Sequence, residues 1–139
     1  MAPPKAKAPP ETREPSIRVI MMPKDTNAYG TIFGGVILSY IDQAGAVEAK
    51  RNGADFIVTV AMREVVFHEP VYVGDLVSFF TETRRIGTTS VMVKVLVWAQ
   101  RFGSNQRSYV TEALVTLVAV DDQGRKVAIA KPSRSGGAE

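Results

Sequence analysis

The sequence predicts an α+β domain in which one long central helix is wrapped by a curved antiparallel sheet of five or six strands. Residues 35–51 carry the only convincing long helical period, and residues 56–130 are rich in β-branched side chains and divided by turn-forming residues. One strand, one long helix and then four or five antiparallel strands is an order typical of α+β folds. A strongly apolar helix is buried best when such a sheet curves around it.

The predicted first strand covers residues 16–22 and ends at Pro23. In the helix that follows, one broad apolar face collects Ile37, Leu38, Ile41, Ala44 and Gly45. The opposite face collects Ser39, Gln43 and Lys50. The basic pair Lys50-Arg51 and the following Asn52-Gly53 are stop signals, so we expect the helix to end near Arg51.

The rest of the domain is predicted to be strands. Residues 56–67 are apolar almost throughout, as is typical of a strand that is covered on both faces. In residues 91–99 every second residue is Val or Ala, which predicts a strand with one buried face. Together with these two, strands are expected at residues 76–85, 109–120 and 125–130, with turns at residues 70–75, at Gly87 and at residues 121–124.

Composition limits the possible function classes. The 139 residues suffice for one domain with a single core, expected at residues 16–132. A disordered Pro/Ala/Lys-rich tail is expected at residues 1–15 and a flexible tail at residues 133–139. Cysteine is absent, which excludes disulfides, thiolate metal sites and a cysteine nucleophile. Metal-binding spacing of the HExxH type is also absent, so no metal is expected.

Charge and hydropathy argue against nucleic-acid and membrane partners. The formal net charge is +3, and residues 1–15 and 131–139 contribute +1 each, so the domain lacks the positive surface of a nucleic-acid binder. The apolar runs are too short to span a bilayer. The N-terminal region lacks the features of a secretory signal. The sequence therefore predicts a cytoplasmic protein.

The stretch from residue 23 to residue 42 is the most informative for function. The polar run Asp25-Thr26-Asn27 leads to the pair Gly34-Gly35, where the helix begins. Glycines at a helix start leave the first backbone N–H groups unobstructed, so a polarised carbonyl or an anion can bind there. Asp42 then lies beside the apolar face of the helix, where a carboxylate needs water, a partner or a chemical role. This stretch predicts an active site.

Each candidate residue also has a structural interpretation. Asp42 has the small residues Gly45 and Ala46 one turn further on, which leave room for a ligand or another chain, but it could also lie at a solvated edge or pair with Lys50 or Arg51. Asn27 could orient a water or a carbonyl, or could simply serve the turn. Both interpretations stay open for each residue.

Glu48 and His68 are the other titratable candidates. Glu48 lies about 120° from Asp42 around the helix, too far for a shared catalytic pair, and is expected to reach solvent or a basic residue of the sheet. His68, the only histidine, is expected to face solvent at a strand end.

A second candidate binding region combines Arg84 with the segment Gly87-Thr88-Thr89-Ser90. A hairpin turn explains this segment on its own. Exposed amides, hydroxyls and a guanidinium group would equally suit phosphates or a pantetheine arm.

Taken together, these residues resemble the hot-dog-fold acyl-CoA thioesterases, most closely the YciA-type bacterial enzymes. The resemblance covers residues 18–132. Its most specific parts are Met22-Pro23, Asp25-Thr26-Asn27, Gly30, Ile32-Phe33-Gly34-Gly35, Ile41-Asp42 and Ala44-Gly45-Ala46. Supporting parts are Val58-Thr59-Val60-Ala61, Phe67, Pro70, Val73-Gly74-Asp75, residues 116–121 and Gly124-Arg125.

The resemblance implies an enzyme of lipid metabolism that hydrolyses acyl-CoA to coenzyme A and a free carboxylic acid. In such enzymes Asp42 would be the general base or nucleophile, Asn27 would come from the partner subunit, and Gly34 and Gly35 would meet the thioester carbonyl. Arg84 and the segment from Gly87 to Ser90 would lie near the coenzyme A arm. No cofactor is implied beyond the coenzyme A of substrate and product.

The resemblance also implies a homodimer whose subunits pair edge to edge, with two active sites at the interface, and a trimer of dimers is one further assembly. Glu48 stands where an apolar residue would be expected, and His68 is not a familiar catalytic position in this family. The alternatives are a non-catalytic acyl-CoA-binding protein, a hydratase or dehydratase of the same fold, and a scaffold protein.

Overall fold

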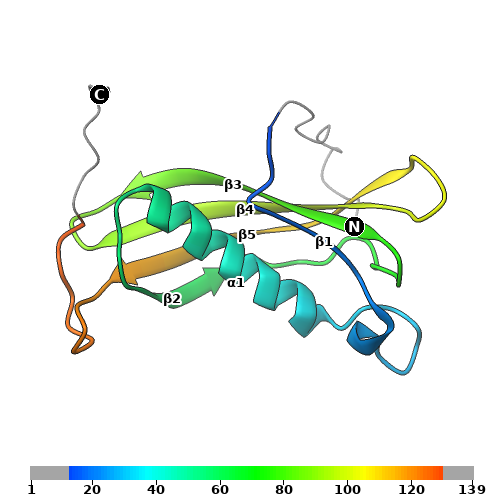
Figure 1. Ribbon diagram of the computed structural model, residues 1–139, viewed down its shortest axis with the longest axis horizontal. Coiled ribbons are helices and arrows are strands. Elements are labelled where there is room, and N and C mark those ends of the chain that lie inside the picture. Colours follow the sequence, from blue (N-terminus) through cyan, green and yellow to red (C-terminus); the bar gives the residue numbers. More distant parts are fainter. Residues whose placement is uncertain (1–12, 130–139) are drawn as a thin grey trace.

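One helix crosses one face of a five-stranded antiparallel sheet in the computed structural model, which describes residues 13–129 (Figure 1). The helix is α1 (Gly34–Arg51). The sheet order is β1-β3-β4-β5-β2, with bounds β1 Ile17–Ile20, β2 Ile57–Arg63, β3 Leu76–Ile86, β4 Ser90–Gln100 and β5 Arg107–Ala119. This confirms the predicted helix and wrapped sheet, with five strands. The tail expected at residues 133–139 and most of the one expected at residues 1–15 lie outside the described residues.

The predicted apolar face of α1 packs on the sheet. Its buried residues are Ile37, Ile41, Ala44, Gly45 and Ala49, while Ser39, Gln43 and Lys50 are exposed as expected. A Cβ placed on Gly45 would lie 3.4 Å from a methyl of Val115 on β5. The lack of a side chain at Gly45 therefore lets the helix lie close to β5. Val115 fills the space there, so no room for a ligand remains beside Gly45.

The strand β4 supplies the centre of the core. Its alternate residues face the helix and are at most 1% exposed; they are Val91, Val93, Val95, Val97 and Ala99. Three of the four strand pairs contain one irregularity in register, at Thr59/Ala61, Thr83/Arg85 and Val97/Trp98. Such bulges increase twist and bending, which lets the sheet curve around α1.

The strand predicted at residues 56–67 differs from β2 in two ways. β2 ends at Arg63, because Glu64 has a φ of 62° and turns the chain out of the strand. β2 is also an edge strand, and its apolar side chains are open in the single chain: Phe56 is 61%, Val58 47% and Val60 57% exposed. The expected cover on both faces is therefore wrong for one protomer.

The strand predicted at residues 125–130 is also wrong for the residues described. After the turn at residues 121–124, only one isolated bridge forms, between Val120 and Lys126. The Val127 N–H still donates to the Ala119 carbonyl, but the Ile129 N–H donates instead to the Thr88 carbonyl in the turn between β3 and β4. Burial of Ile129, which is 7% exposed, pulls this segment off the line of a sixth strand.

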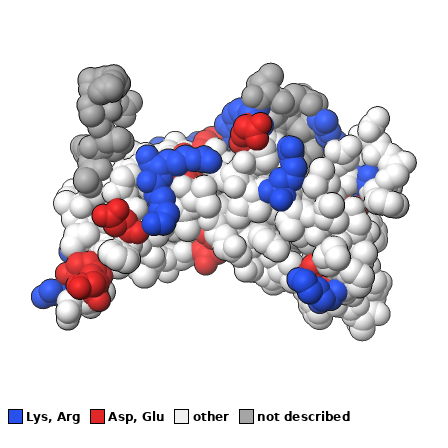
Figure 2. All heavy atoms as spheres, viewed as in Figure 1, with Lys and Arg blue, Asp and Glu red and all other residues white. Residues whose placement is uncertain are grey.

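The described residues 13–129 contain no helix that is long and apolar enough to cross a bilayer. On the face that carries α1, Lys and Arg side chains lie scattered, several beside acidic ones, and much of the surface between them is uncharged (Figure 2).

Candidate active site

The loop before α1 is held by Asp25. The Asp25 carboxylate accepts hydrogen bonds from the Met22 N–H (3.0 Å) and the Lys24 ammonium (3.1 Å). The backbone carbonyl of Asp25 accepts a hydrogen bond from the Phe33 N–H (3.0 Å). These bonds close the loop of residues 25–33 and fix where the helix starts. The bond from the Met22 N–H, followed by the one from Lys24, holds the pKa of Asp25 below its ordinary value.

The start of α1 presents two adjacent free amides. A helix start leaves about four N–H groups without an intrahelical acceptor. Of these, the Phe33 N–H donates to Asp25 and the Val36 N–H to the Phe33 carbonyl (3.0 Å). Residues 13–129 provide no acceptor for the N–H groups of Gly34 and Gly35, and both glycines are exposed. A Cβ on Gly35 would meet no atom within 4 Å. The two amides are therefore open to a carbonyl oxygen or an anion.

Asn27 lies in the same loop and is largely occupied by it. Its side-chain oxygen accepts the N–H groups of Tyr29 (2.8 Å) and Thr31 (3.2 Å), and its side-chain amide donates to the Thr31 hydroxyl (2.8 Å). An amide nitrogen carries two N–H groups, so one donor remains. Asn27 thus shapes the loop, as its structural interpretation expected, and keeps one N–H for another group.

Asp42 is half-buried in α1 and is held by the sheet. Its Oδ1 accepts a short hydrogen bond from the Thr59 hydroxyl on β2. The register of β2 against β5 shifts immediately after Thr59, and bulges often re-aim side chains beside active sites. Asp42 pairs with neither Lys50 nor Arg51, because Arg51 bonds Glu48 and Lys50 bonds the Asp55 carbonyl.

Thr59 is the site residue that the sequence reasoning missed. It appeared only within the supporting motif of residues 58–61, because it lies 17 residues after Asp42 and meets it only when β2 folds along the helix. A hydroxyl residue within an apolar segment is the one signal in the sequence that could have pointed to it.

Within one protomer, Asp42 and the free amides cannot act on the same carbonyl. Asp42 follows Gly35 by seven residues, which is about 10 Å along a helix. The first N–H groups also point out of the helix end, away from the rest of the helix, so a bound carbonyl lies still further from Asp42. One chain therefore offers the two halves of a site, separated along its helix.

The expectation that Glu48 reaches solvent or a basic residue of the sheet is wrong, because its side chain is only 14% exposed and its basic partner, Arg51, belongs to the same helix. The Glu48 carboxylate accepts hydrogen bonds from Thr81 (2.9 Å) and Thr83 (2.7 Å) of β3 and from Arg51 of its own helix (2.9 Å). Burial raises the pKa of Glu48, but the bonds from Thr83, Thr81 and Arg51 outweigh it and hold this pKa below the ordinary value. The acid therefore anchors the helix to the sheet.

His68 also differs from its expected place. It is half-buried, and its ring stacks on Tyr109 with 5.4 Å between centroids. Burial, followed by the hydrogen bond to Glu112, raises the pKa of Tyr109 above its ordinary value.

The predicted coenzyme A region is not brought to the free amides of its own chain. The turn from Gly87 to Ser90 joins β3 to β4 at the end of the sheet near the C-terminus of α1, opposite Gly34 (Figure 1). An 18-residue helix is about 27 Å long, so the two regions lie well apart in one protomer. Arg84 is exposed and pairs with Glu82 (2.9 Å). The role of Arg84, Gly87, Thr88, Thr89 and Ser90 stays a prediction.

Comparison with known families decides the classification. The family model described as "Thioesterase superfamily" matches residues 29–101, more than half of the chain. The chain belongs to the thioesterase superfamily. The matched residues include the end of the loop before α1, the free amides, Asp42 and Thr59, whereas Asp25 and Asn27 lie just before the match.

Individual members of the superfamily are similar over most of their length. The acyl-CoA thioester hydrolase YciA of Escherichia coli K12 is 41% identical over 116 residues, which are 81% of this chain and 88% of that protein. A hexameric hot-dog-fold thioesterase of Campylobacter jejuni has a TM-score of 0.81 at 45% identity, covering 85% of this chain and 91% of that one. A hexameric broad-specificity acyl-coenzyme A thioesterase has a TM-score of 0.80 at 40% identity, covering 85% and 82%. These likenesses confirm the expected hot-dog fold.

No cluster of three or more His, Cys, Asp or Glu side chains suited to a metal ion occurs within residues 13–129.

Proposed function

We propose that the protein is an acyl-CoA thioesterase, which hydrolyses acyl-CoA to coenzyme A and a free carboxylic acid. The observation that carries the proposal is the pair of unpaired, exposed amides at Gly34 and Gly35 in a member of the thioesterase superfamily. Relatives that match four-fifths of the chain are named acyl-CoA thioester hydrolases. The proposed chemistry uses no metal and no cofactor apart from the coenzyme A of the substrate.

The amides would polarise the thioester carbonyl and hold the negative charge that develops on its oxygen. Fixed donors of this kind lower a barrier by about 3–4 kcal/mol each. Asp42 would either take a proton from an attacking water or attack the carbonyl carbon itself to give a mixed anhydride. In both routes the Thr59 hydroxyl binds one carboxylate oxygen and leaves the other facing the reaction.

The two halves of the site would meet across a homodimer interface. Among the residues that the structure describes, β2 pairs with β5 alone and leaves its other edge open, with exposed apolar side chains, which suits edge-to-edge pairing with a second copy. Such pairing is symmetric, so each dimer would hold two sites, each with Asp42 of one protomer and the Gly34-Gly35 amides of the other. The remaining N–H of Asn27, in the same loop as the amides, would orient the water or the carbonyl.

The similar thioesterases also suggest how dimers of this chain assemble further. Because similar thioesterases are hexamers, we propose that dimers of this chain assemble into a trimer of dimers. We also propose that the protein acts in the cytoplasm, where acyl-CoA is available as substrate.

The direct test is release of free thiol from acyl-CoA by the wild-type protein and by Asp42→Asn. The substitution keeps the size and the Thr59 contact but removes the base, so turnover should fall about 100-fold or more. Unfolding temperature and oligomeric state, measured on both proteins, provide the control. Turnover within a few-fold of wild type would remove Asp42 from the chemistry, and acyl-CoA binding without thiol release by the wild type would indicate a non-catalytic binding protein.

A further inference from the structure

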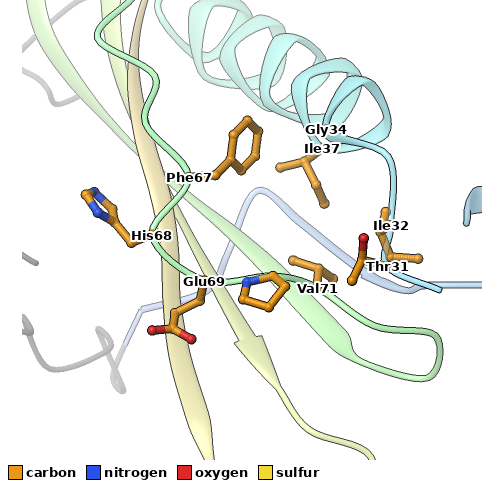
Figure 3. A pocket seen from close by; sticks show the side chains of 9 residues that line it. Thr31, Ile32, Gly34, Ile37, Phe67, His68, Glu69 and Val71 are labelled. Atoms are coloured by element: carbon orange, nitrogen blue, oxygen red, sulfur yellow. The ribbon is translucent and has the colours of Figure 1, made fainter. Parts of the chain in front are cut away.

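A pocket opens beside the free amides, between the start of α1 and the irregular segment that follows β2 (Figure 3). Its volume is about 290 Å³. Gly34 belongs to its lining, so the pocket borders a residue that carries one of the two amides. Thr31, which bonds Asn27, lines it as well. The pocket therefore shares residues with the site but extends away from it.

The interior of the pocket is apolar. Ile32, Ile37 and Val71 line it and are buried, and Phe67 turns its ring toward the helix (Figure 3). A Cβ on Gly34 would lie 3.5 Å from that ring, so Phe67 closes one side of the pocket against the helix start. In Figure 3 the side chains of His68 and Glu69 point away from this apolar space.

We propose that this pocket binds the acyl chain of the substrate, that it selects uncharged chains, and that Phe67 sets the length at which it is full. The inference rests on the proposed thioesterase function. A thioester whose carbonyl oxygen lies at the amides of Gly34 and Gly35 can place its acyl chain in the pocket and its sulfur side toward solvent. Glycine at position 34 leaves the passage between amide and pocket open.

The size and charge of the pocket give the substrate class. Pockets for drug-sized ligands hold about 300–1,000 Å³, so this pocket, at the lower end of that range, is filled at some limiting length of the acyl chain. Among residues 13–129, no Lys or Arg lines the pocket, and its interior is formed by apolar side chains. An acyl group that ends in a carboxylate would thus lose its hydration here without gaining a cationic partner.

The test is a chain-length series of acyl-CoA substrates, with kcat/KM measured for wild type and for Phe67→Ala and Phe67→Trp. For wild type, kcat/KM should rise about fourfold per added methylene, which corresponds to about 0.8 kcal/mol per buried CH₂, and should stop rising once the pocket is full. Phe67→Ala should move that break to longer chains and Phe67→Trp to shorter ones. Butyryl-CoA should be hydrolysed faster than succinyl-CoA.

Val66→Ala is the matched control, because Val66 is the exposed neighbour of Phe67 and does not line the pocket. In Val66→Ala, kcat/KM should stop rising at the same chain length as in wild type. A break that stays at the same chain length in both Phe67 variants, with folding and assembly intact, would overturn the inference while leaving the thioesterase proposal standing.

Binding of non-hydrolysable acyl-CoA thioethers separates the two proposals further. If these analogues show the same chain-length break, moved by Phe67→Ala, while no thioester is hydrolysed, the pocket assignment holds and the proposed function fails. If binding does not depend on chain length, the pocket assignment fails.

Discussion

At the start of α1, the chemistry depends on two backbone amides and not on side chains. Gly34 and Gly35 have no acceptor within residues 13–129, whereas Phe33 and Val36 on either side do. Asp42 is fixed separately, by the Thr59 hydroxyl. The residues that flank the amides thus hold the helix start, and the amides themselves remain free for a ligand.

A matched pair of substitutions at Gly35 tests the amide directly. Gly35→Pro removes the N–H, and proline is tolerated in the first turn of a helix because that N–H has no intrahelical acceptor. Gly35→Ala keeps the N–H, and its Cβ meets no atom of the same protomer within 4 Å. Loss of one such donor should lower kcat about 100- to 1,000-fold in the proline variant.

The alanine variant should lose far less activity in the same thiol-release assay. Equal losses in the two Gly35 variants would show that the added carbon atoms, and not the missing N–H, matter at this position.

The sequence predicted the site residues unevenly, and the reason is physical. Asp42 and the glycine pair could be found because they belong to one helix and its start, where spacing alone fixes position. Thr59 could not, because its contact with Asp42 depends on how β2 lies along the helix. Glu48 was misplaced for the same cause: the helical wheel gave its direction but not the two hydroxyls of β3 that meet it.

At the scale of elements, α1 is held in place at both ends. Just before its start, the Ile32 N–H donates to the Val71 carbonyl in the segment that leads to β3 (2.8 Å). Near its end, Glu48 binds the hydroxyls of Thr81 and Thr83. These attachments place the amides and Asp42 at fixed points of one rigid helix.

Glu48→Gln should destabilise the protein near neutral pH by about 1–3 kcal/mol, because hydrogen bonds to a partly buried charged group are lost. The pKa of Glu48 is lowered in the folded state, so its contribution is full above its ordinary value of 4.5 and is lost as pH falls through the folded value. Urea unfolding of both proteins as a function of pH measures this. The difference between wild type and variant should shrink as pH falls below about 4.5. A difference that stays constant at all pH values would contradict the assignment.

The helix and most strands could be predicted from the sequence, except where contacts outside the single chain determine which residues are buried. Alternation in β4 and the period of α1 reflect packing inside one chain, so pattern and structure agree. The apolar run at residues 56–67 indicated cover on both faces, yet β2 lies at the edge of the sheet. The pattern is explained if a second chain supplies the missing cover, which one chain cannot reveal.

At the scale of the whole molecule, the open edge of β2 is where we expect the dimer to form. Val58→Lys would place a charge in that interface, and charged edge residues are a common way of blocking strand pairing. We expect dissociation toward monomers in light scattering, together with loss of thiol release. Ile20→Lys, at the opposite edge strand β1 and 54% exposed, is the matched control and should keep at least the dimer. A Val58→Lys protein that stays oligomeric would place the interface elsewhere.

Mixing two inactive variants tests most directly whether each active site is shared between protomers. Asp42→Asn and Gly35→Pro are unfolded together, refolded as mixed oligomers and assayed for thiol release, beside each variant treated alone. Because each symmetric dimer interface would combine Asp42 of one chain with the amides of the other, about one quarter of the sites should be intact and activity should return to about one quarter of wild type. Activity no higher than that of the separate variants, in oligomers shown to be mixed, would contradict the shared site.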